Sequence, residues 1–413
     1  MSRPSHELSE IIALYGADFE QKHAPTEQQR SVLSKLCECR TSPLGGHVDA
    51  CDTCGTIRIS YNSCRNRHCP KCQATNRERW IEAREDDLLD VSYFHVVFTL
   101  PEELNPLFLL RSKSMYNILF EAVKLTLELF AGNPKYLGAQ SGHIAVLHTW
   151  GQNLSFHPHL HCIVPAGGAT QQGKWKPLAK AASCSVKTES RNTRYATYLY
   201  PVKALSKEYS KIFMRLLKAN VDIEPEHQPD KQLLKKINDH KWVVYAKQPF
   251  FGPKQVIEYL GRYTHKVAIS NHRIKSVDHG QVTFGWKDYR HGDAQKEMTL
   301  EATEFLRRFC QHILPFRFVK IRHYGILSSR NKLKLRDVQF TMGIVVEKKP
   351  KPSWQEVCKQ KLNFDPELCP HCKVGHLHTV SSWPRWLSGA RAPPPVNADH
   401  RAAIAAAARK ISF

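Results

Sequence analysis

A cysteine-rich stretch between residues 37 and 72 constrains this chain more than any other feature. It holds seven of the thirteen cysteines, among Gly, Asn and Arg residues and few large aliphatic side chains. A segment of this composition cannot bury a hydrophobic core of its own and needs another form of stabilisation. There is no apolar leader, and no run approaches the roughly 18 apolar residues that a membrane span needs. We therefore expect a cytoplasmic protein whose reduced, clustered cysteines bind metal ions.

The cysteine spacing indicates where a metal ion would bind. Fourteen residues separate the pair Cys51-x2-Cys54 from the pair Cys69-x2-Cys72, which is the spacing of a zinc ribbon. Zn²⁺ takes four ligands in a tetrahedron at about 2.3 Å from each sulfur, and paired Cys-x2-Cys turns supply them. We expect these four cysteines to hold a first, structural Zn²⁺. Four residues of suitable types remain for a second site that crosses the first: Cys39, His47, Cys64 and His68.

Parts of this assignment stay open. Cys37 lies beside Cys39 and could take its place, and His68 could instead be solvated or face DNA. Near the C-terminus, the pair Cys369-x2-Cys372 is followed by two histidines and is a candidate for a further small zinc knuckle. One Cys-x2-Cys pair is less specific than two, so the sequence leaves this knuckle undecided.

The charge balance indicates a polyanionic partner. Lys and Arg number 60 against 38 Asp and Glu, which gives a net charge of +22. Nucleic acid is the first interpretation of such a surplus, an anionic membrane surface the second, and a generally solubilising basic surface the third. Arg65, Arg67 and Lys71 lie among the cysteines and suit a zinc-stapled loop that contacts DNA. The alternative is that the metal only shapes a rigid lid.

Helices and strands alternate along the rest of the chain. Residues 93–100, 143–149 and 160–164 are predicted strands, and a long amphipathic helix begins at Pro106. This pattern favours an α+β fold with an antiparallel sheet flanked by helices. We expect three parts: a helical and zinc-binding N-terminal domain over residues 1–90, a central α+β domain over 91–345, and a basic tail rich in Pro and Ala over 346–413.

A histidine cluster gives the first indication of chemistry. His159 and His161 are two residues apart on a predicted strand, so both imidazoles point to the same face. His148 lies on the preceding strand and would join them if the two strands pair antiparallel through the turn at 150–157. Three neutral imidazoles leave open coordination positions, which is typical of a catalytic metal site. A two-metal hydrolase of the metallo-β-lactamase type is disfavoured, because the Asp of its His-x-His-x-Asp-His pattern is absent.

Two tyrosines follow at helical spacing. Tyr259 and Tyr263 are four residues apart, so on a helix they share one face, as core-facing aromatic pairs also do. Gly261 between them weakens a helix by about 1 kcal/mol relative to Ala, and close approach of a DNA backbone would explain it. A tyrosine oxygen beside a metal-bound phosphodiester can attack phosphorus and form a phosphotyrosine.

Four segments together resemble a known family, the rolling-circle transposases of the insertion sequence 91 family. The segments are CRNRHCPKC (64–72), FHVVFTLP (94–101), WGQNLSFHPHLHCIVPAGG (150–168) and YLGRYTHKVAIS (259–270). Within them, His159-Leu-His161 is similar to the "HUH" element of single-strand DNA nickases. The two tyrosines resemble those of the two-tyrosine subclass. The resemblance covers about residues 30–345.

The resemblance implies a zinc-binding N-terminal module followed by an HUH nuclease domain. His159 and His161 would then bind a catalytic Mg²⁺ or Mn²⁺, distinct from the structural zinc, and Tyr259 and Tyr263 would be the nucleophiles. The third ligand is left open between His148 and Gln152. Such enzymes cut one strand at an element end, form a 5′-phosphotyrosine, and use the freed 3′-OH in strand transfer.

The expected partner is therefore DNA, mainly single-stranded at the element ends and the target, in a bacterial cytoplasm and on the nucleoid when DNA is bound. A replication initiator or relaxase with the same chemistry is one alternative, and a non-catalytic zinc protein that binds DNA is another. Four further cations suit contact with the DNA strand being cut: Arg262, Lys266, Arg322 and Arg330. For those within residues 318–336, a solvated β-strand and turn is the alternative.

Overall fold

The protein is described here from a computed structural model. Within the described part of the chain, no helix is long and apolar enough to cross a membrane. The structure describes residues 4–178, 199–220, 230–240, 242–250, 255–256, 259, 261, 266–288, 292–345 and 352–385.

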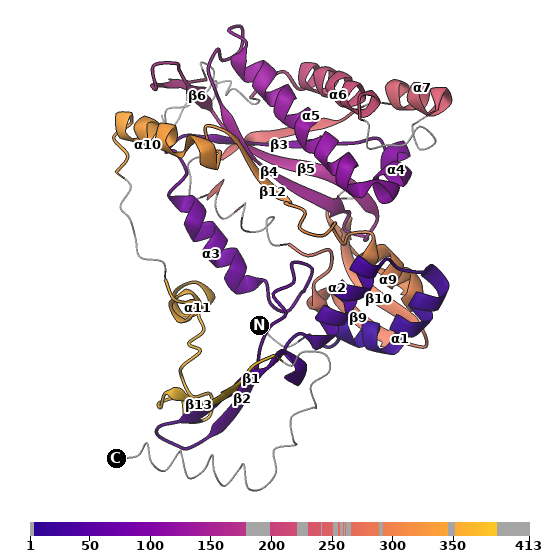
Figure 1. The fold of residues 1–413 in the computed structure, drawn as a ribbon, viewed down its shortest axis with the longest axis vertical. Coiled ribbons are helices and arrows are strands. Elements are labelled where there is room, and N and C mark those ends of the chain that lie inside the picture. The colour runs from indigo at the N-terminus through magenta and orange to yellow at the C-terminus, as the bar shows by residue number, and fades with distance from the viewer. Residues whose placement is uncertain are drawn as a thin grey trace.

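A five-stranded antiparallel sheet forms the centre of the molecule (Figure 1). Its strand order is β12-β4-β5-β3-β8, so β4 and β5, which follow each other in the chain, lie side by side. Strand β4 is buried along almost its whole length, as expected for a strand covered on both faces. The strands are β3 (Tyr93–Thr99), β4 (Gly142–Trp150), β5 (Phe156–Pro165), β8 (Val244–Phe250) and β12 (Ile321–Gly325).

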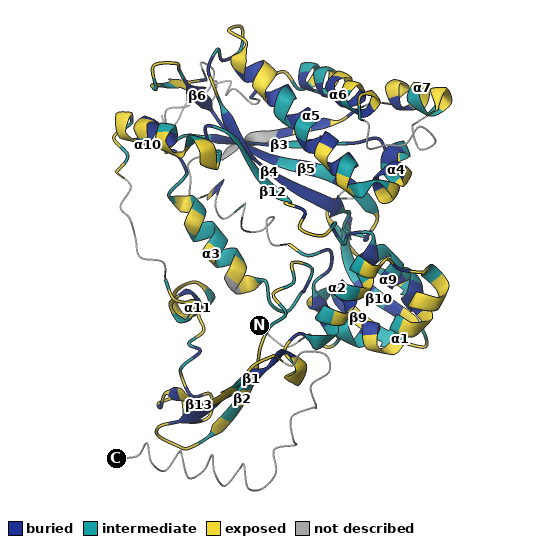
Figure 2. Ribbon diagram, in the orientation of Figure 1, coloured by how far each residue is buried: buried dark blue, intermediate teal, exposed yellow. Residues whose placement is uncertain are grey.

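Helices cover one face of this sheet. The long helix α5 crosses the strands (Figure 1), and its buried side chains share a core with alternate residues of β3 and β5, such as Phe94, Phe98 and Leu160. Figure 2 shows that the central strands are buried, whereas α7 exposes its outer side. The helices on this side are α4 (Asn105–Leu110), α5 (Ser112–Gly132), α6 (Val202–Lys218) and α7 (Lys231–Asp239).

The opposite face of the sheet carries a smaller core and the polar side chains that matter below. Tyr93, Ile144 and Ile163 point to this face and pack with residues from α3 (Ala74–Glu85) and α10 (Lys332–Thr341). Because side chains alternate along a strand, residues an even number of positions from these point the same way. Four histidines therefore point to this face of the sheet: His95, His148, His159 and His161.

The two N-terminal helices pack against a second sheet. Helix α1 contacts α9, and Leu8, Ile11 and Phe19 share a core with Phe284 and Phe305. The helices of the predicted N-terminal domain thus bury their apolar faces against residues 271–310. The domain boundaries at residues 90 and 345 remain predictions. The elements are α1 (Leu8–His23), α2 (Glu27–Glu38), β9 (Ile274–Asp278), β10 (Gln281–Asp288), β11 (Ala294–Glu301) and α9 (Ala302–Cys310).

A third sheet joins distant parts of the chain. Strand β13 (Leu377–Trp383) pairs antiparallel with β1 (Gly46–Cys51), which pairs with β2 (Ile57–Tyr61). Residues 354–383, expected in a basic tail, therefore contain α11 (Trp354–Leu362) and an ordered strand (Figure 1). The α+β class with an antiparallel sheet is confirmed. The remaining short elements are η1 (Ser42–Leu44), η2 (Glu102–Leu104), β6 (Gly167–Ala169), β7 (Trp175–Pro177), η5 (Asn271–Arg273) and η7 (Ser329–Asn331).

Candidate active site and metal centres

Three histidines converge at one end of the central strand pair. His148 on β4 lies directly opposite His159 on β5, and His161 lies opposite Val146. One ring nitrogen from each of the three histidines lies within 4.8 Å of the other two. The antiparallel pairing predicted through the turn at 150–157 is present in the structure, and it brings the three imidazoles together.

Hydrogen bonds orient two of these imidazoles. His159 donates from Nδ1 to the carbonyl of His157 at 2.6 Å, which leaves its Nε2 free as a lone-pair donor to a metal. That Nε2 lies 3.1 Å from Nε2 of His161, whose Nδ1 lies 2.8 Å from Nε2 of His95. Outer partners of this kind fix the tautomer and ring orientation of metal-binding histidines. Both Nε2 atoms therefore face the same small space.

Burial keeps these imidazoles neutral. It lowers the pKa of His159 to about 4, with a further contribution from the neighbouring His157. Burial also lowers the pKa of His161 well below its usual value, and the nearby His148, His159, His95 and Lys266 act in the same direction. A neutral imidazole is the form that binds a metal ion, so the group is ready to act as a ligand set near neutral pH.

Tyr259 reaches this cluster through a residue that the sequence analysis missed. The Tyr259 hydroxyl lies 3.0 Å from each ring nitrogen of His95, and His95 stacks on His161 with 5.1 Å between ring centres. His95 is 1% exposed and comes from β3. The signal in the sequence was a histidine inside the apolar segment 93–99. In the structure, this histidine lies two residues from Val97, which is opposite His161. Tyr263 and Arg262 lie outside the described residues.

Gly261 has a structural explanation different from the one expected. A Cβ atom at this position would collide with the end of the Ile81 side chain on α3, lying 3.1 Å from its Cγ1 and closer still to its Cδ1. Trp80 and Ile81 pack against the same core as Tyr259. The absence of a side chain at Gly261 thus lets α3 pack close to the backbone that carries Tyr259. This contact offers a second explanation for the glycine, and close approach of a DNA backbone stays a prediction.

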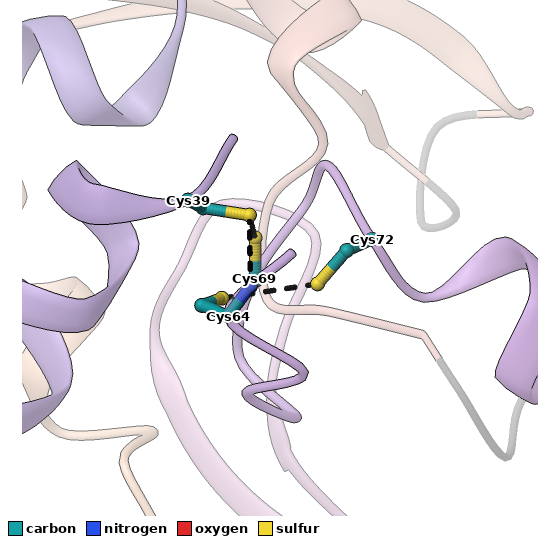
Figure 3. Close-up of side chains that lie close together, drawn as sticks. All are labelled: Cys39, Cys64, Cys69 and Cys72. Atoms are coloured by element: carbon teal, nitrogen blue, oxygen red, sulfur yellow. Dashed lines mark hydrogen bonds between the residues drawn. The ribbon is translucent and has the colours of Figure 1, made fainter. Parts of the chain in front are cut away.

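A first cysteine cluster lies beside the N-terminal helices. The sulfurs of Cys39, Cys64, Cys69 and Cys72 lie within 4.8 Å of one another and point toward a common centre (Figure 3). Cys39 and Cys69 are 3.5 Å apart, and Cys64 and Cys72 are 3.8 Å apart. For thiolates at about 2.3 Å from a tetrahedral Zn²⁺, the sulfurs would be about 3.8 Å apart. The four sulfurs therefore have the spacing of a zinc site.

This grouping corrects the predicted pairing of the cysteines. Cys51 and Cys54 do not join Cys69 and Cys72, because the β1–β2 hairpin carries them away, and their sulfurs lie with those of Cys369 and Cys372 instead. The spacing of 14 residues describes only distance along the chain. It could not predict that β13, more than 300 residues later, pairs with β1. The C-terminal pair, left undecided by the sequence, belongs to a four-cysteine cluster.

The two histidines predicted as zinc ligands lie elsewhere. His47 is paired with Asp49 at 3.4 Å, and His68 accepts the backbone N–H of Leu314 on its Nε2 at 3.4 Å. Neither belongs to a cysteine cluster. The alternative ligand Cys37 donates to the carbonyl of Ser9 at 3.8 Å, on the side of α1. Among the described residues, both clusters therefore consist of cysteines alone.

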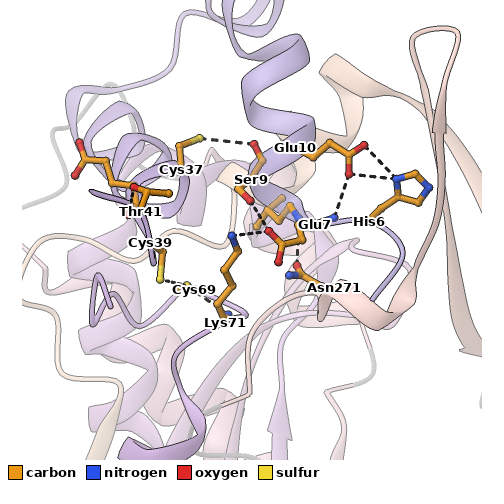
Figure 4. Close-up of polar contacts among 12 residues, drawn as sticks. His6, Glu7, Ser9, Glu10, Cys37, Cys39, Thr41, Cys69, Lys71 and Asn271 are labelled. Atoms are coloured by element: carbon orange, nitrogen blue, oxygen red, sulfur yellow. Dashed lines mark hydrogen bonds and ion pairs between the residues drawn. The ribbon is translucent and has the colours of Figure 1, made fainter. Parts of the chain in front are cut away.

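The cations predicted to bind DNA have different surroundings. Lys71 forms an ion pair with Glu7 at 2.5 Å and is 16% exposed, so it ties the cysteine knuckle to the start of α1 (Figure 4). Arg67 donates to the carbonyl of Phe318. Arg65 is an exposed residue in a left-handed turn, with φ of 52°. Of these three, only Arg65 shows no such structural role within the described part of the chain, and contact with DNA stays a prediction for all three.

The remaining predicted cations lie near β12 and after Tyr259. Arg322 donates to the Asn117 side chain at 2.6 Å and lies over the Phe120 ring at 4.1 Å, so it packs against α5. Arg330 is exposed in η7. Lys266 is close enough to His161 to influence its pKa. Lys266 is therefore a predicted cation that lies near the histidine cluster.

Known proteins resemble the chain over nearly its whole length. Residues 142–334 match a family model described as "Putative transposase", and residues 11–100 match one described as "Transposase zinc-binding domain". The chain is 41% identical to "Putative transposase y4qJ" of Sinorhizobium fredii over 95% of its own length and 98% of that protein. The chain belongs to the insertion sequence 91 family of transposases. As such a transposase it is an enzyme that binds and cleaves DNA.

A second relative supports the same family. The transposase is 29% identical to the "Transposase for insertion sequence element IS801" of Pseudomonas savastanoi, over 84% of this chain and 83% of that protein. No solved structure matches the transposase. The two family models cover the strands with His148, His159 and His161 and the cluster around Cys39. They do not reach Cys369 and Cys372.

Proposed function

We propose that this transposase is an HUH-type nuclease that cuts one DNA strand with a tyrosine nucleophile, in a rolling-circle type of transposition. The observation that carries the proposal is the position of the Tyr259 hydroxyl, 3.0 Å from His95, whose ring lies 2.8 Å from His161. A phenol is thus one side chain away from three converging imidazoles. This arrangement suits attack on a phosphodiester placed between the phenol and a metal ion.

The three imidazoles fit a divalent ion, because two of them are held neutral and have their Nε2 atoms oriented toward one another. A bound divalent ion would neutralise the non-bridging phosphate oxygens and orient the phosphodiester. Mg²⁺ prefers oxygen ligands, so Mn²⁺ suits this donor set better. His148 is the third ligand in this proposal, ahead of Gln152, because its ring nitrogen lies with those of His159 and His161.

The reaction at the phosphodiester is a transesterification. The Tyr259 oxygen forms a bond to phosphorus while the bond from phosphorus to the 3′ oxygen breaks. The phenolic proton passes to water, and the departing 3′ oxygen takes a proton from water. The products are a 5′-phosphotyrosine and a free 3′-OH, which accepts a strand in the reverse of the same step. Tyr263 is the second nucleophile in the proposal.

The tautomers of His161 and His95 give His95 a role in positioning Tyr259. If His161 binds the metal through Nε2, its proton is on Nδ1 and is donated to Nε2 of His95. The proton of His95 is then on Nδ1, where it can be donated to the Tyr259 oxygen. A hydrogen bond donated to a phenolate stabilises the charged form and lowers the pKa of the phenol. His95 therefore positions and activates Tyr259.

The experiment that tests the proposal uses element-end DNA as separated strands and as duplex. With Mn²⁺ present, we expect the protein to become covalently attached to single-stranded DNA, with the adduct surviving a denaturing gel. Duplex DNA of the same sequence should give little adduct. If no adduct forms with either strand over a panel of end sequences, the protein is not a tyrosine nuclease, and a zinc protein that only binds DNA becomes the better interpretation.

Replacing His95 by Phe should slow adduct formation on the order of 10- to 100-fold, the usual effect of losing an outer partner of a metal ligand. Phe fills the buried position but cannot donate to Tyr259, so the pKa of the phenol rises. The rate of His95→Phe should therefore reach half of its maximum at a higher pH than the wild-type rate. The measurement is the initial rate of adduct formation across a pH series.

The matched control is His143→Phe. His143 is also buried in the central sheet, but its side chain belongs to the opposite face and stacks on Tyr324. This control should retain the wild-type pH profile. A His95→Phe variant with the wild-type rate and pH profile would contradict the role of His95, although it would leave the tyrosine chemistry intact.

A further inference from the structure

The second cysteine cluster joins the two ends of the described chain. Cys51 and Cys54 lie at the end of β1 and just after it, whereas Cys369 and Cys372 lie more than 300 positions later, just before β13. The Cys51 and Cys372 sulfurs are 3.7 Å apart, as are those of Cys54 and Cys369. A disulfide would need about 2.05 Å, whereas the edge of a zinc–sulfur tetrahedron is about 3.8 Å. The spacing is therefore that of four thiolates around one metal ion.

The two Cys-x2-Cys turns share one backbone closure, and both place N–H donors on sulfur. The backbone N–H of Cys54 donates to the Cys51 sulfur within the first turn at 3.5 Å, and the N–H of Gly375, just after the second turn, donates to the Cys372 sulfur at 3.3 Å. Each turn also closes through a backbone hydrogen bond to the carbonyl of its first cysteine, from Gly55 at 3.1 Å and from Lys373 at 3.0 Å. Such donors stabilise thiolate sulfur.

Gly375 lets the two turns face each other. A Cβ atom at Gly375 would lie 2.5 Å from the Cys51 sulfur and 2.5 Å from the Thr53 hydroxyl. Real Cβ atoms do not approach neighbours so closely, so a larger residue would separate the turns. Asp52 reinforces the contact, because its backbone N–H donates to the His376 carbonyl at 3.0 Å and its side chain accepts the His376 N–H at 2.8 Å.

The sheet next to the cluster has a small apolar core. Val48 and Ala50 are buried on β1, and the buried cluster beside them consists of Cys51, Cys369 and Leu377. On β2, Ile57 and Ile59 are about half exposed. A module with so little buried apolar surface needs a metal or another cross-link to fold. The polar contacts Thr379 to Asp49 at 2.9 Å and Arg58 to Asp49 at 3.1 Å set the register but do not replace a core.

We propose that Cys51, Cys54, Cys369 and Cys372 bind a second structural Zn²⁺, which fastens the C-terminal segment around β13 onto β1 and β2. The site goes beyond the zinc-binding domain matched at residues 11–100, because half of its ligands come from the other end of the chain. It would also make β13 and the cysteine turn before it part of the same module as β1 and β2. The proposal does not depend on the tyrosine chemistry.

The test measures zinc per chain by plasma emission in the full-length protein. Cys369→Ser/Cys372→Ser should contain one zinc ion fewer than the wild type, and Cys51→Ser/Cys54→Ser should lose the same single ion. The variant with all four substitutions should lose no more than either pair alone, because the pairs share one ion. Cys358→Ser is the matched control, since Cys358 is buried in α11 outside both clusters, and it should lose none.

A conservative variant separates loss of the metal from misfolding. Cys372→His should keep the ion, because three Cys and one His also bind Zn²⁺, whereas Cys372→Ser should lose it. Limited proteolysis should cut the 352–385 segment faster in Cys372→Ser than in Cys372→His. Unchanged zinc in Cys369→Ser/Cys372→Ser would overturn the proposal, as would a loss of two ions in the four-cysteine variant against one in each pair.

Discussion

A protein with Phe at both Tyr259 and Tyr263 should form no covalent adduct with single-stranded element-end DNA. The substitution removes only the phenolic oxygens, so binding of DNA should persist while the bond to phosphorus cannot form. Losing the nucleophile of a covalent mechanism lowers the rate on the order of 10⁶-fold, which is complete loss on a gel. The measurement is adduct yield with Mn²⁺ together with DNA binding by fluorescence anisotropy.

The single variants assign the order of the two tyrosines. Because the Tyr259 hydroxyl lies 3.0 Å from His95, we expect Tyr259→Phe to lose the first cut and Tyr263→Phe to retain it. Tyr136→Phe is the control, since Tyr136 packs against Phe130, after α5, on the helix-covered face. Adduct formation by the double variant at the wild-type rate would show that another residue attacks the phosphodiester.

Removing two of the proposed metal ligands with His159→Ala/His161→Ala should abolish binding of Mn²⁺ at the histidine cluster. Adduct formation should fall on the order of 10³-fold or more, because a metal ion stabilises the charge that builds on the phosphate oxygens by several kcal/mol. Titration calorimetry with Mn²⁺ and the adduct assay together check this result. The zinc content should not change, because no described histidine belongs to the cysteine clusters.

The control for this pair is His279→Ala, whose side chain is 92% exposed in a turn. His148→Ala and Gln152→Ala distinguish the two candidates for the third ligand. We expect His148→Ala to weaken Mn²⁺ binding and Gln152→Ala to leave it close to the wild type. Wild-type Mn²⁺ affinity and activity in His159→Ala/His161→Ala would show that the histidine cluster is a structural feature of the sheet.

The sequence could predict the geometry of the histidines because local rules decide it. Alternation along a strand places His159 and His161 on one face, and a short turn makes the neighbouring strands pair antiparallel. The structure has that pairing, with His148 opposite His159. His95 could not be found in this way, because only the strand order of the sheet places β3 beside β5. The local pattern predicts His159 and His161 as ligands, with His148 as a third candidate. His95, the partner of Tyr259, follows only from the strand order.

The cysteines show where spacing fails. The two pairs within residues 51–72 fit a zinc ribbon on their own, but Cys69 and Cys72 group with Cys39 and Cys64, and Cys51 and Cys54 group with Cys369 and Cys372. Cys39 comes from the end of α2, and Cys369 comes from a segment that the composition marked as a tail. The pairing of β1 with β13 is a contact between chain ends, which no local periodicity encodes.

Two single residues make the same point about packing. Gly261 is explained by the Ile81 side chain on α3, and Lys71 is held by Glu7 at the start of α1. In the sequence, Gly261 suggests close approach of a DNA backbone, and Lys71, which lies beside cysteines, suggests a loop that contacts DNA. Their partners lie about 180 and 64 positions away in the chain, so the sequence alone could not reveal the contacts.

The central claim is that the Tyr259 oxygen attacks the DNA in the first cut. The most direct measurement is tandem mass spectrometry of peptides from the wild-type protein, trapped early in a reaction with Mn²⁺ and a single-stranded element end. We predict a nucleotide attached through its 5′ phosphate to the oxygen of Tyr259. A nucleotide on any other residue, or attachment through a 3′ phosphate, would contradict the claim.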